Sequence, residues 1–243
     1  MYESYFKIVK EQLSKVSSDW NFKHELPYLE VVETLHKYDK NLYTKLLKST
    51  WIYHFYKKDL VDLCRKNDEF GKPILYDFPE FGKCGLSNFR YIYHAILILE
   101  HMKEKNLEKV DIIEIGGGYG GLCFFLYNLS KFFNITISSY SIFDQEDVIQ
   151  LQQKYLQNLG ITINTFTINS FEVQKNSFLI SNYALSKFEE NIRNKYVEKV
   201  IKPYVKDGFL CWNFIPFYKF CDLPFKTTEE VPSTYPGNLY VYF

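Results

Sequence analysis

Hydrophobic positions along the chain follow two patterns, and the change between them falls near residue 110. Over residues 1–107, apolar side chains recur every three or four positions, as in amphipathic helices. From residue 110 onwards, short runs rich in β-branched and aromatic residues alternate with amphipathic stretches. This alternation predicts β-α-β units, in which a parallel sheet carries helices on both faces.

The N-terminal pattern predicts several helical stretches separated by loops. They are residues 5–16, 26–38, 41–64 and 87–105. In the first stretch, five side chains share one face: Tyr5, Ile8, Val9, Gln12 and Val16. Ser87 or Asn88 is available as the N-cap of the last stretch, because either side chain can accept a hydrogen bond from the first helical turn. The Gly- and Pro-rich residues 66–88 are predicted to form a loop.

The C-terminal pattern predicts the sheet and its connecting helices. The strands are residues 110–115, 135–143, 161–168, 177–183 and 209–215, and the helices are residues 121–133, 146–160 and 188–205. About ten residues separate the third strand from the fourth, so this crossover must be short. The pair Asp207-Gly208 separates the last helix from the last parallel strand, and residues 238–243 are predicted to form an antiparallel edge strand. The predicted fold class is therefore α/β, with a Rossmann-like parallel sheet, an antiparallel edge strand and a helical N-terminal region.

Length and composition agree with a folded protein of one or two domains. The chain has 243 residues, of which 47% are apolar, and this is enough to bury a sizeable core. We expect residues 1–85 to form a helical cap or lid and residues 86–243 to form a Rossmann-like domain that holds the ligand.

The charge balance and the cysteine spacing indicate which partners and which cellular compartment to expect. The 29 Lys and Arg residues balance the 29 Asp and Glu residues, so the basic excess typical of nucleic-acid-binding proteins is missing. The five cysteines are scattered and never spaced as C-x-x-C, which favours a reducing compartment. The sequence contains no apolar run of the length that a membrane span needs, and its N-terminus has no signal-peptide pattern. We expect a soluble cytoplasmic protein without a nucleic-acid or membrane partner.

Residues 110–123, VDIIEIGGGYGGLC, form the most informative motif of the chain. A β-branched strand runs into a loop in which five of six positions are glycine. Gly116, Gly118 and Gly121 satisfy the G-x-G-x-x-G pattern of dinucleotide-binding loops. A loop for a sulfonium nucleoside needs the same tight turn, close backbone approach and helix N-terminus. The loop is predicted to hold one of these two ligands through Gly116, Gly117, Gly118, Tyr119 and Gly120.

Glu114 separates the two ligand classes. It lies two positions before the first glycine, near the end of an otherwise apolar strand. A carboxylate buried there is unfavourable unless a cation or a hydrogen-bond donor meets it. It would repel a pyrophosphate, and dehydrogenases usually keep this position apolar. S-adenosylmethionine carries an ammonium and a sulfonium, so Glu114 favours that ligand, although it could instead cap a helix or pair with a lysine.

Asp144, with Gln145 beside it, supports either nucleoside. It lies at the end of the second strand, where a carboxylate can accept hydrogen bonds from ribose hydroxyls. It could instead be the N-cap of the helix that begins near Glu146.

These residues carry a resemblance to a known family. EIGGGYGG (114–121) resembles motif I of class I S-adenosylmethionine-dependent methyltransferases. Together with FDQEDVIQLQQKYL (143–156) and FLISNYALSKFEENIRNKYVEKVI (178–201), it resembles more narrowly the sugar O-methyltransferases of polysaccharide and nucleotide-sugar gene sets. The resemblance covers roughly residues 85–215.

The resemblance implies the class I methyltransferase fold, S-adenosylmethionine as cofactor and a set of site residues. Asn182 and Tyr183 would face the transferred methyl group, and Asn169 or Ser170 would hold the adenine amino group. The residues implied to line the cofactor site are Glu114, Gly116, Gly118 and Asp144. The acceptor implied is a sugar or nucleotide sugar, a small molecule, and a homodimer is left open.

Methylation of a hydroxyl needs a general base, because the hydroxyl is a poor nucleophile until its proton leaves. The candidate catalytic residues are His94, Glu189 and Asn182. His94 could instead be a buried structural histidine, and Glu189 with Glu190 could instead stabilise a helix N-terminus. Arg90 could clamp the cofactor's carboxylate or lie on the surface. No spacing of His and carboxylates predicts a metal site.

Two other functions stay open. The alternatives are an NAD(P)-dependent oxidoreductase that uses the glycine loop and a nucleotide-fold module that binds without catalysis.

The aromatic run WNFIPFYKF (212–220) follows the fifth strand at the ligand edge. It could stack on a sugar face or form part of the core.

Overall fold

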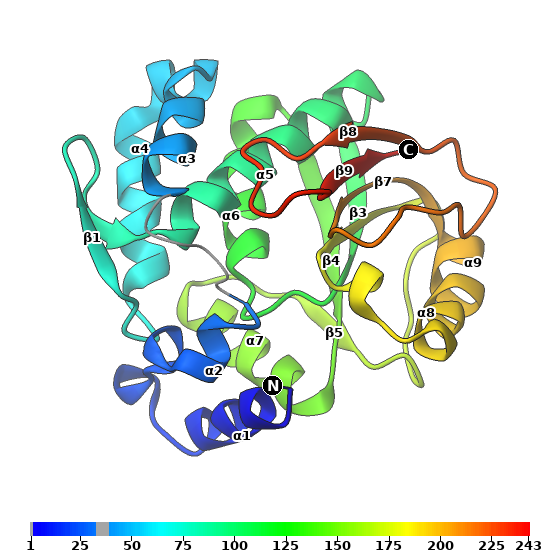
Figure 1. The fold of residues 1–243 in the computed structure, drawn as a ribbon, viewed down its shortest axis with the longest axis horizontal. Coiled ribbons are helices and arrows are strands. Elements are labelled where there is room, and N and C mark those ends of the chain that lie inside the picture. The colour runs from blue at the N-terminus through cyan, green and yellow to red at the C-terminus, as the bar shows by residue number, and fades with distance from the viewer. Residues whose placement is uncertain (1, 33–38) are drawn as a thin grey trace. The chain divides into compact units, whose positions relative to one another are not determined.

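The computed structural model describes residues 2–32 and 39–243 (Figure 1). Two compact units are present, and each is built from three segments of the chain. The first unit contains Met1–Leu99, Gly118–Phe133 and Glu146–Thr162, and the second contains Glu100–Gly117, Asn134–Gln145 and Ile163–Phe243. The boundary at residue 85 between a cap and a ligand-binding domain stays a prediction.

The first unit is mainly helical, and the predicted helical N-terminal region is confirmed. Its helices are α1 (Tyr2–Leu13), η1 (Ser17–Asp19), η2 (Phe22–His24), α2 (Leu26–Leu29), α3 (Asp39–Lys48), α4 (Trp51–Asp68), most of α5 (Ser87–Glu104), α6 (Gly121–Leu129), η3 (Ser130–Phe133) and α7 (Glu146–Asn158). Its strands are β1 (Leu75–Phe78) and β2 (Gly82–Gly85).

The first helix is shorter than its apolar pattern predicts. The predicted face supplies three buried side chains, Tyr5, Val9 and Gln12. The helix ends at Leu13, however, and Val16 is exposed. The carbonyl of Gln12 accepts a hydrogen bond from the indole Nε1 of Trp20, at 2.9 Å, so the chain turns back before the pattern reaches Val16.

Residues 66–88 were predicted to be a loop, but they contain a β-hairpin. β1 and β2 pair in antiparallel register, with Leu75 opposite Gly85. The turn between the strands uses Gly82 in the left-handed region, at φ 72°, where a residue without a side chain is favoured. Ser87 and Asn88 are the first residues of α5 rather than residues before it.

The second and third predicted helical stretches also differ from the structure. Residues 41–64 belong to two helices, α3 and α4, because Thr50 begins a new one: its Oγ1 accepts a hydrogen bond from the N–H of Tyr53 at 3.3 Å. Only the first four residues of the stretch 26–38 form α2. The part of this prediction that falls on residues 33–38 lies outside the described residues.

The first unit buries a lysine among aromatic rings. Lys23 is 2% exposed, and its Nζ lies 4.3 Å from the ring centroid of Tyr119 and 4.8 Å from that of Tyr155. The same Nζ donates hydrogen bonds to the Tyr155 hydroxyl, at 3.0 Å, and to the carbonyl of Asn67. Burial raises the pKa of Asp68, and the charge of Lys23 opposes this rise. The lysine therefore ties the N-terminal segment to Tyr119, which belongs to the glycine loop.

The second unit contains the sheet that the sequence predicts. Its strands are β3 (Lys109–Ile115), β4 (Thr136–Phe143), β5 (Asn164–Phe166), β6 (Ser177–Asn182), β7 (Val205–Trp212), β8 (Lys226–Glu229) and β9 (Leu239–Tyr242). They are ordered β5-β4-β3-β6-β7-β9-β8. The first five in this order pair in parallel, and β9 pairs antiparallel with both β7 and β8. The prediction of an α/β fold with a Rossmann-like parallel sheet and an antiparallel edge is confirmed.

The antiparallel edge has two strands where one was predicted. Residues 238–243 supply β9, but β9 lies between β7 and β8, so β8 is the edge strand. β8 has the sequence KTTE, and all four of its residues are exposed. A polar edge strand of this kind has no alternation of apolar and polar residues, which is the signal on which strand prediction depends.

Two strand boundaries were wrong for identifiable reasons. The predicted strand 161–168 is reduced to β5, because its first residues complete the end of α7: Gly160 has φ 75° and Ile161 N–H donates to the Leu156 carbonyl at 2.9 Å, as in a Schellman motif. β7 begins at Val205, before the Asp207-Gly208 pair. That glycine is thus a strand residue.

The last helical stretch begins at Glu190 and contains an irregular turn. It consists of α8 (Glu190–Tyr196), a π-helical turn η5 (Val197–Ile201) and α9 (Lys202–Tyr204). Pro203 lies in α9 and has no N–H to donate to the preceding turn, which is a common cause of such irregularity.

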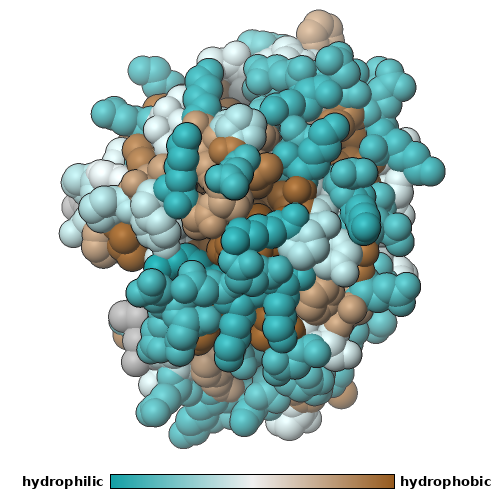
Figure 2. All heavy atoms as spheres, turned by 90° about the vertical axis from the view of Figure 1, so that its right-hand side faces the viewer, coloured by the Kyte–Doolittle hydropathy of each residue, from teal (hydrophilic) through white to brown (hydrophobic). Residues whose placement is uncertain are grey.

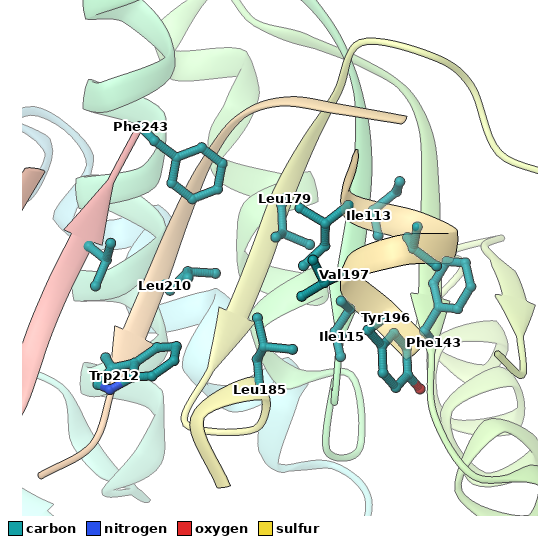
Figure 3. Packing of buried hydrophobic residues seen from close by; sticks show 13 residues of the cluster. Ile113, Ile115, Phe143, Leu179, Leu185, Tyr196, Val197, Leu210, Trp212 and Phe243 are labelled. Carbon is teal, nitrogen blue, oxygen red and sulfur yellow. The ribbon is translucent and has the colours of Figure 1, made fainter. Parts of the chain in front are cut away.

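These helical turns pack against the sheet to form the core of the second unit. Figure 3 shows Val197 beside Leu179 and Ile113, and the ring of Tyr196 beside Phe143. At the other end of the cluster, Trp212, Leu210 and Phe243 contribute from β7 and from the end of β9. The core therefore reaches the carboxyl ends of the strands, where Ile115, Phe143 and Trp212 are the last residues of β3, β4 and β7.

Gly208 is predicted to be essential for this packing. An added Cβ would lie 2.4 Å from Phe243 Cζ and 2.8 Å from the carbonyl oxygen of Leu179. We expect Gly208→Ala to lower the free energy of unfolding by about 2–3 kcal/mol, as overpacked core sites do, in urea denaturation. Thr227→Ala, on the exposed strand β8, is the control and should change stability by less than about 0.5 kcal/mol. Equal effects of the two substitutions would contradict this role of Gly208.

The face drawn in Figure 2 shows apolar side chains in several areas among hydrophilic ones. Across the described part of the chain, no helix has both the length and the apolar character that crossing a membrane requires.

Candidate functional site

The order of the parallel strands fixes where a ligand is expected. The chain winds from β3 through β4 to β5 in one direction and then from β6 to β7 in the other, so the direction switches between β3 and β6. In open α/β sheets, ligands bind outside the carboxyl ends of the strands at such a point. The residues at the relevant strand ends in the second unit are Glu114, Gly116, Gly117, Asp144, Asn182 and Tyr183.

Glu114 is a buried carboxyl group at this switch point. It is 2% exposed, and the hydroxyl of Tyr140 donates a hydrogen bond to its Oε2 at 2.9 Å. Burial raises the pKa of Glu114 to about 7, the negative charge of Asp144 contributes to the rise, and the bond from Tyr140 opposes it. Among the side chains that the structure describes, no lysine, arginine or histidine forms an ion pair with Glu114. The alternative that Glu114 pairs with a lysine is therefore not supported.

The partner Tyr140 was missed by the sequence analysis. In the parallel register, Ile112 lies opposite Tyr140 and Glu114 lies opposite Ile142. Side chains two residues apart on a strand share a face, so Tyr140 and Glu114 point to the same side of the sheet. Once the register of β3 and β4 is known, the two-residue alternation of side chains along a strand identifies this pair.

The first half of the glycine loop passes close to both neighbouring strands. Gly116 has φ 76°, and its N–H donates to the carbonyl of Phe143 at 2.9 Å. An added Cβ on Gly116 would lie 2.3 Å from Ala184 Cβ, and one on Gly117 would lie 2.9 Å from a methyl of Ile142 and 3.2 Å from Glu114 Oε2. Both glycines are partly exposed. The partly exposed main chain of the loop thus lies beside Glu114, and neighbouring side chains leave no room for a Cβ on either glycine.

The second half of the loop leads into α6 in the first unit. Gly118 and Gly120 have φ 58° and 96°, and Gly120 is the N-cap of the helix. Gln152 Nε2 donates to the carbonyl of Gly118 at 2.9 Å, while the buried Tyr119 contacts Lys23. These contacts support the left-handed turns at the helix N-terminus, where backbone N–H groups are available.

Asp144 lies close enough to Glu114 for its negative charge to contribute to the raised pKa of Glu114. Its Oδ1 accepts a hydrogen bond from the N–H of Gln145 at 2.9 Å, and Gln145 is exposed. α7 begins at Glu146, so Asp144 precedes the helix by two positions and the N-cap alternative is not supported. Its carboxylate is partly exposed at the end of β4, where a ribose is expected.

Asn169 and Ser170 lie in a turn just after β5. A bridge between Thr167 and Ser170 closes this turn, and both predicted residues are exposed. The crossover from β5 to β6 contains no helix, as its short length predicts. The role of these two residues toward an adenine stays a prediction.

Asn182 is the last residue of β6, which pairs with the strand of Glu114, and Tyr183 follows it. Both are partly buried. Tyr183 adopts φ 60°, and its N–H donates to the carbonyl of Cys211 at 2.8 Å. Ser181 Oγ donates to the carbonyl of Ile115 at 2.9 Å, which bonds the end of β6 directly to the end of β3. A tyrosine in the left-handed region is unusual, and such conformations gather at functional sites.

Glu230 is a functional candidate that the sequence analysis missed. It is 2% exposed, and the hydroxyl of Tyr183 donates a hydrogen bond to its Oε1. Its Oε2 accepts from the N–H and the hydroxyl of Thr234, each at 2.7 Å, and from Asn238 Nδ2 at 3.0 Å. Nothing in the segment TTEEVPST distinguishes Glu230 from its exposed neighbour Glu229, so only the structure reveals it.

His94 and Arg90 lie on α5 in the first unit, and both are buried. Burial lowers the pKa of His94 well below its usual range, and the charge of Arg90 adds to this effect, so the imidazole is neutral at neutral pH. Arg90 Nη2 donates to the carbonyl of Val32 at 2.9 Å. The surface position considered for Arg90 is therefore wrong, while its role toward a carboxylate stays a prediction.

Glu189 is exposed and occupies the N-cap position of α8, although its side chain makes no capping bond. Glu190 is the first residue of that helix. Both positions suit carboxylates near a helix N-terminus, which was the alternative to a catalytic role. Within the described residues, no group of three His, Cys, Asp or Glu side chains gathers as a metal site.

The aromatic run after β7 divides between core and surface. Trp212 is buried and packs against Phe217 and Phe220, with ring centroids 5.2 and 6.1 Å away. Phe214 and Tyr235 are 57% and 56% exposed, and their ring centroids lie 4.9 Å apart. Trp212 thus realises the core alternative for this run, whereas stacking on a sugar face stays a prediction for the exposed Phe214.

Comparisons with known proteins give structural similarity alone. No family model and no curated protein matches the chain. A Nostoc punctiforme protein with an O-methyltransferase assignment is 12% identical, with a TM-score of 0.45 over 65% of this chain and 58% of its own length. A S-adenosylmethionine-dependent methyltransferase from Aquifex aeolicus is 14% identical, with a TM-score of 0.41 over 59% and 87% of the two chains. The plantazolicin methyltransferase BpumL, in complex with S-adenosylhomocysteine, is 11% identical, with a TM-score of 0.38 over 84% and 61%. Similarities of this size do not assign a function.

Proposed function

We propose that the protein is an S-adenosylmethionine-dependent methyltransferase that acts on a hydroxyl of a sugar or sugar-containing small molecule. The observation that carries the proposal is the buried carboxyl of Glu114 beside the glycine loop, which has Tyr140 but no cation among its described partners. A buried carboxylate is stable only when an opposite charge or several donors meet it. A ligand with a cationic amino-acid end supplies that charge.

The residues around Glu114 fit such a ligand. Gly116 and Gly117 are partly exposed, and the position of a Cβ on Gly117 lies 3.2 Å from Oε2 of Glu114. Asp144 presents a carboxylate for ribose hydroxyls at the next strand end. When bound, S-adenosylmethionine supplies an activated methyl group on a sulfonium sulfur. The chain's own part is to hold the ligand's ammonium at Glu114 and its ribose at Asp144, because transfer of this kind depends mainly on alignment.

A nicotinamide dinucleotide fits the same residues less well. Its pyrophosphate would lie on the glycine loop, next to a carboxyl group that has no neutralising cation among its described neighbours. Two like charges at close range in a buried site are strongly unfavourable. The oxidoreductase alternative therefore requires Glu114 to stay protonated, at a pKa of about 7.

A hydroxyl-bearing acceptor with an apolar ring face is supported by two features of the second unit. Phe214 and Tyr235 form an exposed aromatic pair. Aromatic faces pack against apolar ring surfaces. Beside Phe214, Asn213 is 5% exposed, and its buried Oδ1 accepts no hydrogen bond from any described residue. Such an acceptor atom is normally satisfied, and a sugar hydroxyl would satisfy it.

Calorimetric titration of the protein with S-adenosylhomocysteine and, separately, with NADH tests the cofactor. We expect S-adenosylhomocysteine to bind in the micromolar range and NADH to give no heat. Binding of NADH alone would overturn the proposal. A second experiment incubates the protein with S-adenosylmethionine labelled in the methyl group and with free hexoses, UDP-hexoses and GDP-hexoses. Label in a sugar product is expected, whereas binding without transfer to any of them would favour the non-catalytic alternative.

A further inference from the structure

We infer that Tyr183 and Glu230 form a hydrogen-bonded pair that accepts the proton of the acceptor hydroxyl. This inference rests on the proposed function and names the general base that the sequence analysis did not find. Tyr183 is the first residue after β6, at the switch point where the ligand is expected, and its hydroxyl bonds to Glu230.

The conformation of Tyr183 directs its side chain to Glu230. The residue sits in the left-handed region at φ 60°, which is unfavourable for a bulky side chain. Two bonds hold it there, from its N–H to the carbonyl of Cys211 and from its hydroxyl to Glu230. Packing alone does not require a tyrosine to adopt this backbone conformation. The conformation is explained because it places the phenol of Tyr183 at Glu230.

Four hydrogen bonds fix the position of the Glu230 carboxylate. Thr234 and Asn238 donate three hydrogen bonds to one carboxylate oxygen, and Tyr183 donates to the other. Tyr183 is the titratable group in contact with Glu230, and no lysine, arginine or histidine within the described residues pairs with this carboxylate. A carboxylate without a cation but with a phenol at hand can take the phenol's proton when the phenol receives another.

In the proposed step, methyl transfer is coupled to two proton transfers. The acceptor oxygen forms its new bond to the transferred methyl carbon, whose former bonding electrons remain on the sulfonium sulfur. At the same time, the proton of the acceptor hydroxyl moves to Tyr183 Oη, and the phenolic proton moves from Tyr183 to Glu230. Glu230 then releases this proton to water. The products are the methyl ether, S-adenosylhomocysteine and one proton.

The exposed pair of Phe214 and Tyr235 would place the acceptor for this step. Tyr235 lies one residue after Thr234, which donates to Glu230, and the carbonyl of Tyr235 accepts from the N–H of Asn238 at 3.1 Å. The loop that holds Glu230 therefore also carries one ring of the aromatic pair. A ring stacked there and a hydroxyl directed to Tyr183 would be positioned by one segment of the chain.

Tyr183→Phe and Glu230→Gln test the pair. We expect each substitution to lower kcat by about 10²–10⁴-fold, the usual contribution of a general base, with the KM of the sugar acceptor changed less than threefold. The affinity for S-adenosylhomocysteine, measured by calorimetry, should stay within twofold of the wild-type value. Tyr240→Phe is the matched control: its hydroxyl donates to the carbonyl of Val231 in the same loop, and its removal should leave kcat unchanged.

A spectroscopic measurement without any substrate complements the kinetics. The ultraviolet difference between each protein and its Tyr183→Phe derivative reports the titration of this one phenol. Because a nearby carboxylate disfavours the phenolate, Glu230→Gln should lower the pKa of Tyr183.

The outcomes separate this inference from the proposed function. If the wild type methylates a sugar and Tyr183→Phe keeps kcat within threefold, the inference is overturned while the function stands. If Glu230→Gln fails to fold, Tyr183→Phe still decides. A wild type that binds S-adenosylhomocysteine but methylates no hydroxyl overturns both. If the variants lose kcat and cofactor affinity to the same extent, the pair has a purely structural role. This result also overturns the inference.

Discussion

Glu114→Gln is expected to reduce the affinity for S-adenosylhomocysteine by about 100-fold or more and to stabilise the ligand-free protein above pH 7. The first effect follows because the buried carboxylate would pair with the ligand's ammonium. Removing one partner of a buried ion pair costs about 3 kcal/mol or more, and about 2.8 kcal/mol corresponds to 100-fold in affinity. Glutamine has nearly the same shape and can still accept the hydrogen bond from Tyr140.

The second effect follows from the titration of Glu114. Its pKa is raised from 4.5 to about 7 by burial, so between these pH values the unfolded chain has released a proton that the folded protein keeps. The free energy of unfolding therefore falls as the pH rises through this window. At about 1.36 kcal/mol for each pKa unit, the loss reaches about 3 kcal/mol above pH 7. Glutamine does not titrate, so the variant should match the wild type near pH 4.5 and exceed it by up to that amount at pH 8.

Urea denaturation at the two pH values and calorimetry measure these effects. Asp111→Asn is the matched control, because Asp111 lies on the same strand and accepts a hydrogen bond from Ser139 on β4 at 2.5 Å, but it is partly exposed and away from the glycine loop. Its neutralisation should leave the affinity for S-adenosylhomocysteine unchanged. If Glu114→Gln bound S-adenosylhomocysteine as tightly as the wild type, the cofactor proposal would lose its main support.

Gly116→Ala is expected to destabilise the protein by about 2–5 kcal/mol. Part of this loss is the left-handed backbone at φ 76°, which costs an ordinary residue about 1–2 kcal/mol. The rest is steric, because the new methyl would lie 2.3 Å from Ala184 Cβ, and overpacking costs about 1–3 kcal/mol. Relief of the clash would move β3's loop away from the end of β6, so affinity for S-adenosylhomocysteine should also fall.

Gly160 allows the two contributions to be separated. It has nearly the same φ, 75°, but an added Cβ would meet nothing within 4 Å. Gly160→Ala should therefore show the backbone cost alone, about 1–2 kcal/mol. Adding Ala184→Gly to Gly116→Ala should bring its loss of stability close to that of Gly160→Ala. A double variant as unstable as Gly116→Ala would show that contact with Ala184 is not the cause.

The parts of the fold that follow from simple periodicity were predictable. β3 and β4 are each followed by a helix of clear 3.6 period, and right-handed crossovers place the carboxyl ends of the parallel strands on one edge of the sheet. The polar strand β8 was not predictable, because its partners are supplied by β9 from elsewhere in the chain. Asp207-Gly208 was misassigned for a related reason: a glycine signals a turn locally, whereas here it makes room for the ring of Phe243.

The candidate site was predictable only where one short segment carries it. Glu114 and the glycines lie within one strand and its loop, so the motif shows them. Tyr140 becomes visible only with the strand register. Glu230 is 47 residues from Tyr183, and its burial depends on how the last loop folds over polar neighbours. Such contacts between distant segments leave no periodic signal in a single sequence.

The interleaving of the two compact units has a consequence for how this protein could diversify. The longest segment of the second unit, Ile163–Phe243, is continuous and contains Tyr183, Glu230 and the exposed aromatic pair. Glu114 and the glycine loop are encoded upstream of it. A single genetic crossover near codon 163 would therefore replace all of these downstream residues at once and leave the upstream ones intact. Under the proposed function, gene recombination at that junction offers a route to new acceptor preferences while the strand proposed to bind the methyl donor is kept.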